Sequence, residues 1–324
     1  MCRTYNGADI NAEPGVNPQI KDGRGNLAPV TIILPTIAML AKEKSEKQSK
    51  PIVDVFIDLL DTKIHEAKDM LLERFNHMCS QPAAAAKFMY ENNTMIGYKP
   101  EEGIISALKH GTLVIGQLGL AEALQILIGC DHTDSKGLEL AETIEQLFMT
   151  RCKQFKNDYK LNFGVYYTPA ENLCYTAMTK FKEKYGVIPN VSDRAYFTNS
   201  MHVPVWHKLD PFEKIDIESK LTGYSSGGCI TYVELPASTL NNLEALETIV
   251  NYMMDKDIPY GAINIPVDRC KCGYTSEIND TCPKCGSDEI LKLRRVTGYL
   301  SSDYRHFNKG KQAEVEDREK HITN

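Results

Sequence analysis

The chain has 324 residues, of which 42% are hydrophobic and 25% are charged. This composition is ordinary for a globular protein with a sizeable core, and the length fits one large domain with a small appendage, or two domains. The formal net charge of -6 argues against a surface that coats nucleic acid, because such a surface would be basic. No apolar run approaches the roughly 20 residues of a membrane-spanning helix, and the polar start of the chain does not have the pattern of a signal peptide. We therefore expect neither a membrane nor nucleic acid as a direct partner.

The chain contains ten cysteines, four close together near its end and six scattered through it. A secreted, disulfide-stabilised scaffold would be smaller and would distribute its cysteines along the chain. The distribution therefore indicates a protein of the reducing cytoplasm, with one metal site and several free thiols.

The hydrophobic pattern predicts strands that alternate with helices. Residues 1–29 are rich in glycine and proline and predict a long irregular loop. After this loop, β-branched or apolar runs predict strands, and apolar positions at helical spacing predict helices. In chain order these are a strand at 30–34, a helix at 52–75, a strand at 113–118, a helix at 138–155, a strand at 163–167 leading into a helix at 168, a strand at 229–235, a helix at 243–254 and an extended segment at 261–267. Such alternation indicates an α/β architecture with largely parallel strands.

A shift in composition at Asp268 introduces the clustered cysteines, which form two pairs: Cys270 with Cys272 and, after nine residues, Cys282 with Cys285. A glycine follows the second cysteine of each pair and eases a tight turn whose backbone amides point at the sulfurs. Four thiolates at this spacing suit tetrahedral Zn²⁺ in a closed, structural site. The alternatives are two disulfides or free thiols, which are less common for such pairs in a cytosolic chain.

The segment Arg294-Arg-Val-Thr-Gly-Tyr-Leu300 follows the cysteine pairs. From pattern alone, Gly298 is a turn residue with positive φ. However, Arg-Val-x-Gly-Tyr near a carboxy terminus resembles the signature of glycyl-radical enzymes. A radical on a glycine Cα delocalises over the flanking amide and carbonyl groups, and no side chain blocks planarity or the approach of an activating enzyme. The resemblance therefore implies that Gly298 stores a radical.

Further motifs indicate which of these enzymes the chain resembles. Anaerobic ribonucleotide reductases have a cysteine knot just before the radical glycine, whereas other glycyl-radical enzymes lack it. Similarity to the reductases extends over nearly the whole chain, in Gly23–Thr31, Gly164–Glu171, Thr198–Pro204, Phe307–Lys311, Glu314, Arg318 and His321. The resemblance implies three regions: the carboxy-terminal part of a ten-stranded α/β barrel at 1–267, with 1–29 as its finger loop; a zinc-binding knot at 268–290; and a glycyl-radical loop and tail at 291–324.

The resemblance also places catalytic residues on the finger loop. Cys2, in Cys-Arg-Thr, matches the cysteine that becomes a transient thiyl radical. Asn26, in Gly-Arg-Gly-Asn, matches an asparagine near the active site of formate-dependent members. Without the resemblance, Cys2 would be an incidental loop thiol and Asn26 a turn residue.

The substrate-binding candidates lie after the strand at 163–167. Locally, Thr168 and Glu171 form a helix cap with a capping box, and that can be their whole role. A helix start at the end of a strand also presents free amides to an anion, and the family places the substrate's phosphates near this turn, so Thr168 and Ala170 are candidates. Asn199 and His202 are candidates through the family motif alone.

The implied activity is the anaerobic reduction of ribonucleoside triphosphates to 2′-deoxyribonucleoside triphosphates. A radical S-adenosylmethionine activase, which carries an iron-sulfur cluster, removes a hydrogen from Gly298, and the glycyl radical then takes hydrogen from Cys2. The thiyl radical abstracts the 3′-hydrogen of the substrate, water leaves from the 2′ position, reduction follows and the 3′-hydrogen returns. Formate is the implied reductant if Asn26 stands where the family places its asparagine.

The resemblance implies protein partners as well. Family members carry several hundred residues before the finger loop, so we expect a separate amino-terminal half and a homodimer of the complete enzyme. Because half a barrel exposes unpaired sheet edges, the chain should be poorly soluble unless it assembles with that half. The alternative functions are another glycyl-radical enzyme of the formate-lyase or dehydratase type, a non-catalytic zinc-ribbon binding protein, or an inert remnant.

Overall fold

The computed structural model describes residues 3–92, 94–296, 298–301 and 303–322, and parallel strands lie at its centre. β1 (Asn26–Ile33), β2 (Thr112–Leu118) and β3 (Asn162–Tyr166) form a parallel sheet in that order. β4 (Thr231–Glu234) and β5 (Gly261–Asn264) form a parallel pair, which a parallel bridge between Tyr166 and Gly228 connects to β3. The five strands therefore follow one another in space in the order of the chain.

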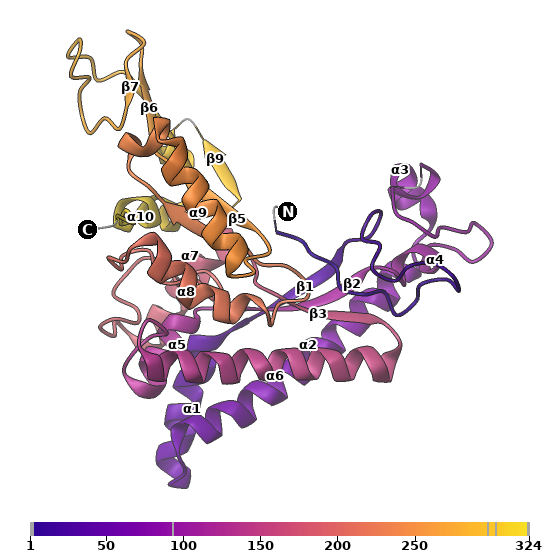
Figure 1. Ribbon diagram of the computed structural model, residues 1–324. Coiled ribbons are helices and arrows are strands. Elements are labelled where there is room, and N and C mark those ends of the chain that lie inside the picture. The colour runs from indigo at the N-terminus through magenta and orange to yellow at the C-terminus, as the bar shows by residue number, and fades with distance from the viewer. Residues whose placement is uncertain (1–2, 93, 297, 302, 323–324) are drawn as a thin grey trace.

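Helices make the crossovers between these strands. Between β1 and β2 are α1 (Leu34–Gln48), α2 (Ile52–Cys79), η1 (Ala83–Ala86), α3 (Lys87–Glu91) and α4 (Ile105–Leu108). Between β2 and β3 are α5 (Leu120–Ile128) and α6 (Ser135–Tyr159), and between β3 and β4 are α7 (Glu171–Tyr185) and α8 (Pro211–Thr222). η2 (Ala237–Asn241) and α9 (Leu243–Asp255) connect β4 to β5. In Figure 1, α2 and α6 run along the same side of β1–β3, whereas α8 and α9 lie beside β4 and β5.

The main hydrophobic core fills the space between the three-stranded sheet and helices α1, α2, α5 and α6. All seven residues of β2 are buried, as expected for the central strand of a parallel sheet that is covered on both faces. Helix α2 buries one stripe at intervals of three and four residues: Val55, Phe56, Leu60, Ile64, Ala67, Lys68, Leu71 and Phe75. Among the described residues, every helix is too short or too polar to span a bilayer.

An antiparallel sheet follows the parallel strands. Its order is β7 (Thr275–Ser276), β6 (Val267–Cys270), β8 (Ile290–Val296) and β9 (Tyr299–Ser301). The end carrying β6 and β7 projects away from the body of the protein (Figure 1). After η3 (Tyr304–His306), α10 (Lys309–Asp317) returns to the body and packs on α7. Consequently, the β8–β9 hairpin, residues 290–301, is held near the parallel strands.

The structure confirms the α/β architecture with parallel strands and corrects several expected boundaries. Residues 26–29 belong to β1 and are not part of an irregular loop, and the expected strand at 261–267 is divided between β5 and β6. The helix expected from Thr168 begins at Glu171, with Ala170 at the N-cap and no side-chain cap. The capping box predicted for Thr168 and Glu171 is therefore wrong, and both side chains have other partners.

A buried carboxyl on α6 makes the stability of the fold depend on pH. Glu145 is fully buried, and its Oε1 accepts a hydrogen bond from Gln117 Nε2 at 2.7 Å. Burial raises the pKa of Glu145 to about 8, so the folded state favours the protonated form. A raised carboxyl pKa costs stability as pH rises from its ordinary value of 4.5 to about 8.

We predict that Glu145→Gln, which keeps the acceptor for Gln117, gains thermal stability over the wild type as pH rises from about 5 to about 8. The measurement is the thermal unfolding midpoint at the two pH values. Glu139→Gln, at an exposed position of the same helix, is the control and should show no such trend. A Glu145→Gln difference that is independent of pH would contradict the protonated assignment.

Candidate active site and metal centre

Three of the substrate-binding candidates lie together where the parallel strands end. The Thr168 and Thr31 hydroxyl oxygens are 2.9 Å apart, which connects the carboxyl ends of β3 and β1. A Cβ at Gly116 of β2 would lie 1.9 Å from Thr168 Oγ1, so only glycine leaves room for this hydroxyl. The Ala170 N–H donates to Asn199 Oδ1 at 2.9 Å. Asn199 therefore satisfies the amide of the N-cap residue of α7, and a bound anion would have to use the amides that follow.

The opening segment, residues 3–25, closes over the neighbouring strand ends. Asn26 Nδ2 donates to the Gly227 carbonyl at 2.7 Å, and the Tyr5 N–H donates to the same oxygen at 2.9 Å. Gly228 has φ +128°, and a Cβ there would lie 1.7 Å from the Arg3 carbonyl oxygen. Glycine at position 228 is thus required for this segment to approach. Asn26 Oδ1 is buried and has no hydrogen-bond partner among the described residues.

The base of the opening segment is anchored by Asp9. Its Oδ1 accepts from Asn162 Nδ2 at 2.8 Å, and its Oδ2 lies 2.7 Å from His110 Nδ1. Burial alone would raise the pKa of Asp9, but the hydrogen bonds from Asn162 and His110 outweigh it and hold the pKa below its ordinary value. The ionised carboxylate therefore fixes the segment to β3 and to the turn before β2. The sequence contained no motif that identified Asp9.

Cys2 lies outside the described residues, but the position of its neighbour Arg3 is informative. Arg3 donates to the Tyr167 carbonyl and to the Tyr232 hydroxyl, each at 3.2 Å. Its guanidinium carbon is 5.8 Å from the centroid of the Tyr232 ring, and that of Arg295 on β8 is 5.5 Å from the same centroid. One aromatic ring on β4 therefore contacts both the beginning of the chain and the strand that leads to Gly298.

Gly298 lies at the exposed tip of the β8–β9 hairpin, whose register pairs Val296 with Tyr299. A Cβ at Gly298 would lie 2.4 Å from Glu171 Oε1, so a side chain at this position would require the flexible Glu171 carboxylate to move. Burial raises the pKa of Tyr299, and the neighbouring Glu171 carboxylate raises it further. Sequence reasoning treated Glu171 as a structural cap, because its contact with the hairpin depends on tertiary structure.

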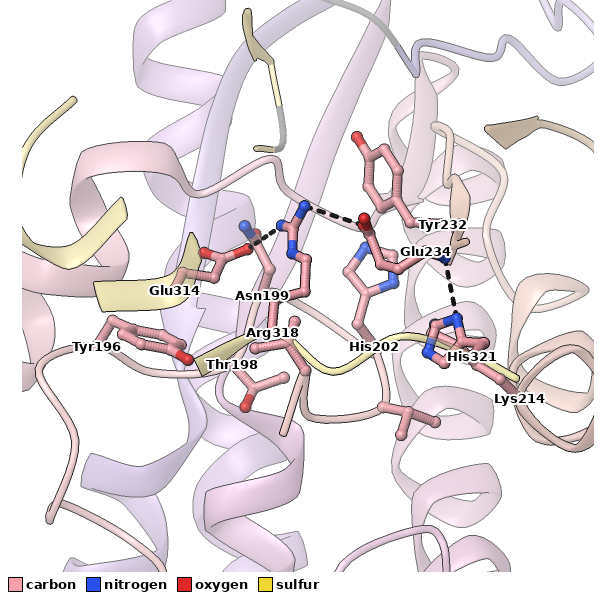
Figure 2. A pocket seen from close by; sticks show the side chains of 12 residues that line it. Tyr196, Thr198, Asn199, His202, Lys214, Tyr232, Glu234, Glu314, Arg318 and His321 are labelled. Carbon is pink, nitrogen blue, oxygen red and sulfur yellow. Dashed lines mark hydrogen bonds and ion pairs between the residues drawn. The ribbon is translucent and has the colours of Figure 1, made fainter. Parts of the chain in front are cut away.

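An enclosed cavity of about 40 Å³ lies between the loop before α8, strand β4 and the tail (Figure 2). It has room for a few water molecules. His202, one of the predicted site residues, lines it together with Asn199 and His321. Burial lowers the pKa of His202 and lowers that of His321 to about 3, so both rings are neutral at physiological pH.

Beside this cavity, Arg318 of the tail contacts β4, α10 and β8. Its Nη1 lies 2.9 Å from Glu234 Oε1 on β4, and its Nη2 lies 3.2 Å from Glu314 Oε1 on α10 (Figure 2). Nη1 also donates to the Arg295 carbonyl of β8 at 2.9 Å. The fully buried Lys311 contributes a second cation, with Nζ 2.5 Å from Glu314 Oε2. The sequence had identified Arg318 and Glu314 only as parts of a tail motif.

The four clustered cysteines are brought together by the turns that the sequence predicts. Gly273 and Gly286 adopt φ of +87° and +69°. The sulfurs of Cys270 and Cys285 are 3.5 Å apart, those of Cys272 and Cys282 are 3.7 Å apart, and all four lie within 4.8 Å of one another. A tetrahedral ion with metal–sulfur bonds of about 2.3 Å would set its sulfurs about 3.8 Å apart. The arrangement can therefore hold a metal ion such as zinc, and the pairs are not disulfides.

Comparison with known proteins agrees with these features. The family model described as anaerobic ribonucleoside-triphosphate reductase matches residues 1–321. The chain belongs to this reductase family. Anaerobic ribonucleoside-triphosphate reductases of Salmonella typhimurium and Escherichia coli are each 34% identical to it over 342 residues, covering all of the chain and 46% of the relative. The enzyme named in the same way from Enterobacteria phage T4 is 34% identical over 94% of the chain and 50% of the relative.

Solved structures show the same fold for this member of the reductase family. An anaerobic ribonucleotide reductase matches with a TM-score of 0.74 and 20% identity, over 93% of this chain and 46% of that one. The Thermotoga maritima reductase crystallised with dATP in its specificity site matches with a TM-score of 0.64 and 20% identity, over 86% and 43%. The chain thus spans about half the length of the curated relatives it matches. The alternatives of another glycyl-radical enzyme or a zinc-ribbon binding protein are not favoured.

We predict that removing the metal unfolds the projecting end of the antiparallel sheet and leaves the parallel strands intact. Its core contains only Cys270, Ile278 and Cys282, with two half-buried neighbours, so it has little stability without a metal clip. Cys282→Ser should lose bound zinc, measured by elemental analysis, and residues 267–290 should become sensitive to protease. Cys79→Ser, outside the cluster, is the control. Equal zinc content in Cys282→Ser and wild type would contradict the assignment.

We predict that Arg318→Met loosens the β8–β9 hairpin and α10, because it removes the cation that pairs with the buried Glu234 carboxylate. Breaking a buried ion pair costs about 3–5 kcal/mol, which should reduce the local opening free energy of these two elements in hydrogen exchange. Arg305→Met removes an arginine whose side chain is 73% exposed and paired only with Asp303, so its effect should be near zero. Similar effects of the two substitutions would show that Arg318 does not hold the tail.

Proposed function

We propose that the chain is the carboxy-terminal part of an anaerobic, glycyl-radical ribonucleoside-triphosphate reductase. One observation carries the proposal beyond family membership: Arg3 and Arg295 contact the same Tyr232 ring. Arg3 directly follows Cys2, and Arg295 is three residues before Gly298. A radical glycine and a cysteine that exchange hydrogen must lie close together, and the shared ring brings their two segments to one place.

In this proposal Gly298 stores the radical and Cys2 becomes the transient thiyl radical. An activase that uses S-adenosylmethionine and an iron-sulfur cluster removes a hydrogen atom from Gly298, which the exposed hairpin tip presents. Gly298 then takes a hydrogen atom from the Cys2 thiol, and the thiyl radical abstracts the 3′-hydrogen of the substrate. The contribution of the protein is to hold these groups in order and to exclude water and oxygen.

The substrate is proposed to bind across the carboxyl ends of β1–β4. The amino end of α7 offers amides and a positive dipole end to the phosphates, with Thr168 and Ala170 at the turn. Asn199 orients this turn by accepting the hydrogen bond of the Ala170 amide. His202 lines the adjoining cavity together with Asn199. Asn26, with an unpaired Oδ1, lies next to the opening segment and is the proposed contact for the reductant.

The reduction balances with formate as the two-electron donor. The ribonucleotide loses its 2′-hydroxyl as water and gains one hydrogen, formate is oxidised to carbon dioxide, and one proton is consumed. The glycyl radical is regenerated at the end of each turnover. The four cysteines are proposed to hold Zn²⁺, which stabilises the sheet that carries the β8–β9 hairpin.

The five parallel strands leave β1 and β5 at the open ends of the strand order. We propose that they are half of a ten-stranded barrel, that the other half is an amino-terminal polypeptide, and that the complete enzyme is a dimer. Residues 1–267 would form the barrel part, 268–290 the zinc knot, and 291–324 the radical loop and tail. The several free thiols suit the reducing cytoplasm.

The decisive experiment is anaerobic activation of the chain together with its amino-terminal half and a cognate activase. We predict a doublet in electron paramagnetic resonance, with deoxyribonucleotide formed only when substrate and reductant are added. Gly298→Ala should lose both the doublet and all activity, because Cα can no longer form a planar glycyl radical and its Cβ meets Glu171. The absence of a doublet in the activated wild type would overturn the proposal.

A further inference from the structure

Glu122 is a buried carboxyl in the first turn of α5, and it binds a residue outside its own helix. Its Oε1 accepts two hydrogen bonds from Thr198, one from the backbone N–H and one from the hydroxyl, each at 2.7 Å. A glutamate at the third position of a helix often bonds to the amide of the N-cap residue. Here the amide of the N-cap residue, Gly119, donates instead to the Thr198 carbonyl at 3.1 Å. The start of α5 therefore holds Thr198 by its amide, its carbonyl and its hydroxyl.

Thr198 directly precedes Asn199, which holds the turn at the start of α7. Asn199 Oδ1 accepts the hydrogen bond of the Ala170 amide at 2.9 Å. The residues that follow each partner of this bond have left-handed backbones, with φ of +38° at Glu171 and +40° at Ser200. Such strain persists only where the surrounding structure maintains it. The attachment of Thr198 to α5 supplies that support from one side of the turn.

A second buried carboxylate holds the other end of the same segment, but its charge is compensated. Glu218 Oε1 accepts from the Val203 N–H at 3.1 Å and forms an ion pair with Lys214. Glu122 has no ion pair among the described residues, and its Oε2 is buried there without a hydrogen-bond partner. Burial raises the pKa of Glu122 to about 7, against the effect of the two Thr198 hydrogen bonds. A buried carboxyl that lacks a compensating cation costs stability, so its contact with Thr198 is better explained by the site than by the core.

We propose that Glu122 is a positioning residue for the substrate's phosphates: it fixes Thr198 and thereby holds Asn199 against the Ala170 amide. This inference rests on the proposed function, in which the amino end of α7 binds the triphosphate. Because Asn199 occupies the Ala170 amide, the amides of the first turn of α7 are the donors left for the anion. When Thr198 is released, the strained turn relaxes and these amides lose their alignment with the phosphates.

The first test measures amide hydrogen exchange at Ala170 in the chain combined with its amino-terminal half, and it needs no radical. Glu122→Ala should make this amide exchange several-fold faster, because Asn199 is no longer held against it. Glu122→Gln keeps an oxygen acceptor for Thr198 and should exchange like the wild type. Thr198→Val removes only the hydroxyl hydrogen bond, so it should have an intermediate effect and tests the same contact if Glu122→Ala does not fold. Leu71→Ala, which opens a cavity in the main core, is the control for lost stability and should leave Ala170 unchanged.

The second test separates positioning from stability through the kinetics of the activated enzyme. Glu122→Ala should raise the KM for the ribonucleoside triphosphate several-fold, while the radical doublet and the kcat per radical change less than about twofold. Glu122→Gln should return KM to near the wild-type value, and Leu71→Ala should leave it unchanged. Unchanged Ala170 exchange, unchanged KM, or equal effects in Leu71→Ala would each overturn the inference. If the wild type forms no radical or no product, the proposed function fails, and the exchange at Ala170 still decides whether Glu122 holds the turn.

Discussion

The Arg318 guanidinium is buried between three parts of the chain that are distant in sequence. It pairs with Glu234 on β4 and Glu314 on α10, and it donates to the Arg295 carbonyl on β8. A buried cation is tolerated only where opposite charge compensates it, so the Glu234 and Glu314 carboxylates must both lie beside it. The arrangement therefore couples the tail, the parallel strands and the strand that leads to Gly298. The location of the candidate radical site depends on this coupling.

The two loops of the site are each anchored by buried polar side chains. Asp9, with Asn162 and His110, fixes the opening segment, and Arg318 fixes the β8–β9 hairpin. Between these anchors the loops reach the strand ends through close contacts at Gly228 and Glu171. The neutral His202 and His321 beside the cavity add polar groups without adding net charge. These contacts hold the two segments in place beside the parallel strands.

Local pattern predicted much of the fold, because apolar periodicity and β-branched runs mark helices and strands wherever the core requires them. Helix α2 and strands β2 and β3 agree with the sequence to within a few residues. The cysteine cluster followed from spacing, and Gly298 from resemblance. The role of Glu171 could not be predicted, because its local pattern is that of a capping box and its actual partners are more than 120 residues away. Tyr232 and Asp9 were missed for the same reason: both act through distant contacts and neither belongs to a short motif.

The shared contact at Tyr232 has a consequence for biosynthesis. The Tyr232 ring lies on β4. The two guanidinium groups that contact it belong to Arg3 and Arg295. During translation, Arg3 leaves the ribosome long before Tyr232 and Arg295 are made, so the shared contact at this ring cannot form until both have emerged. The arrangement is completed only when the last thirty or so residues have emerged. A chain that ends before β8 therefore has the parallel strands but lacks Arg295 at the Tyr232 ring.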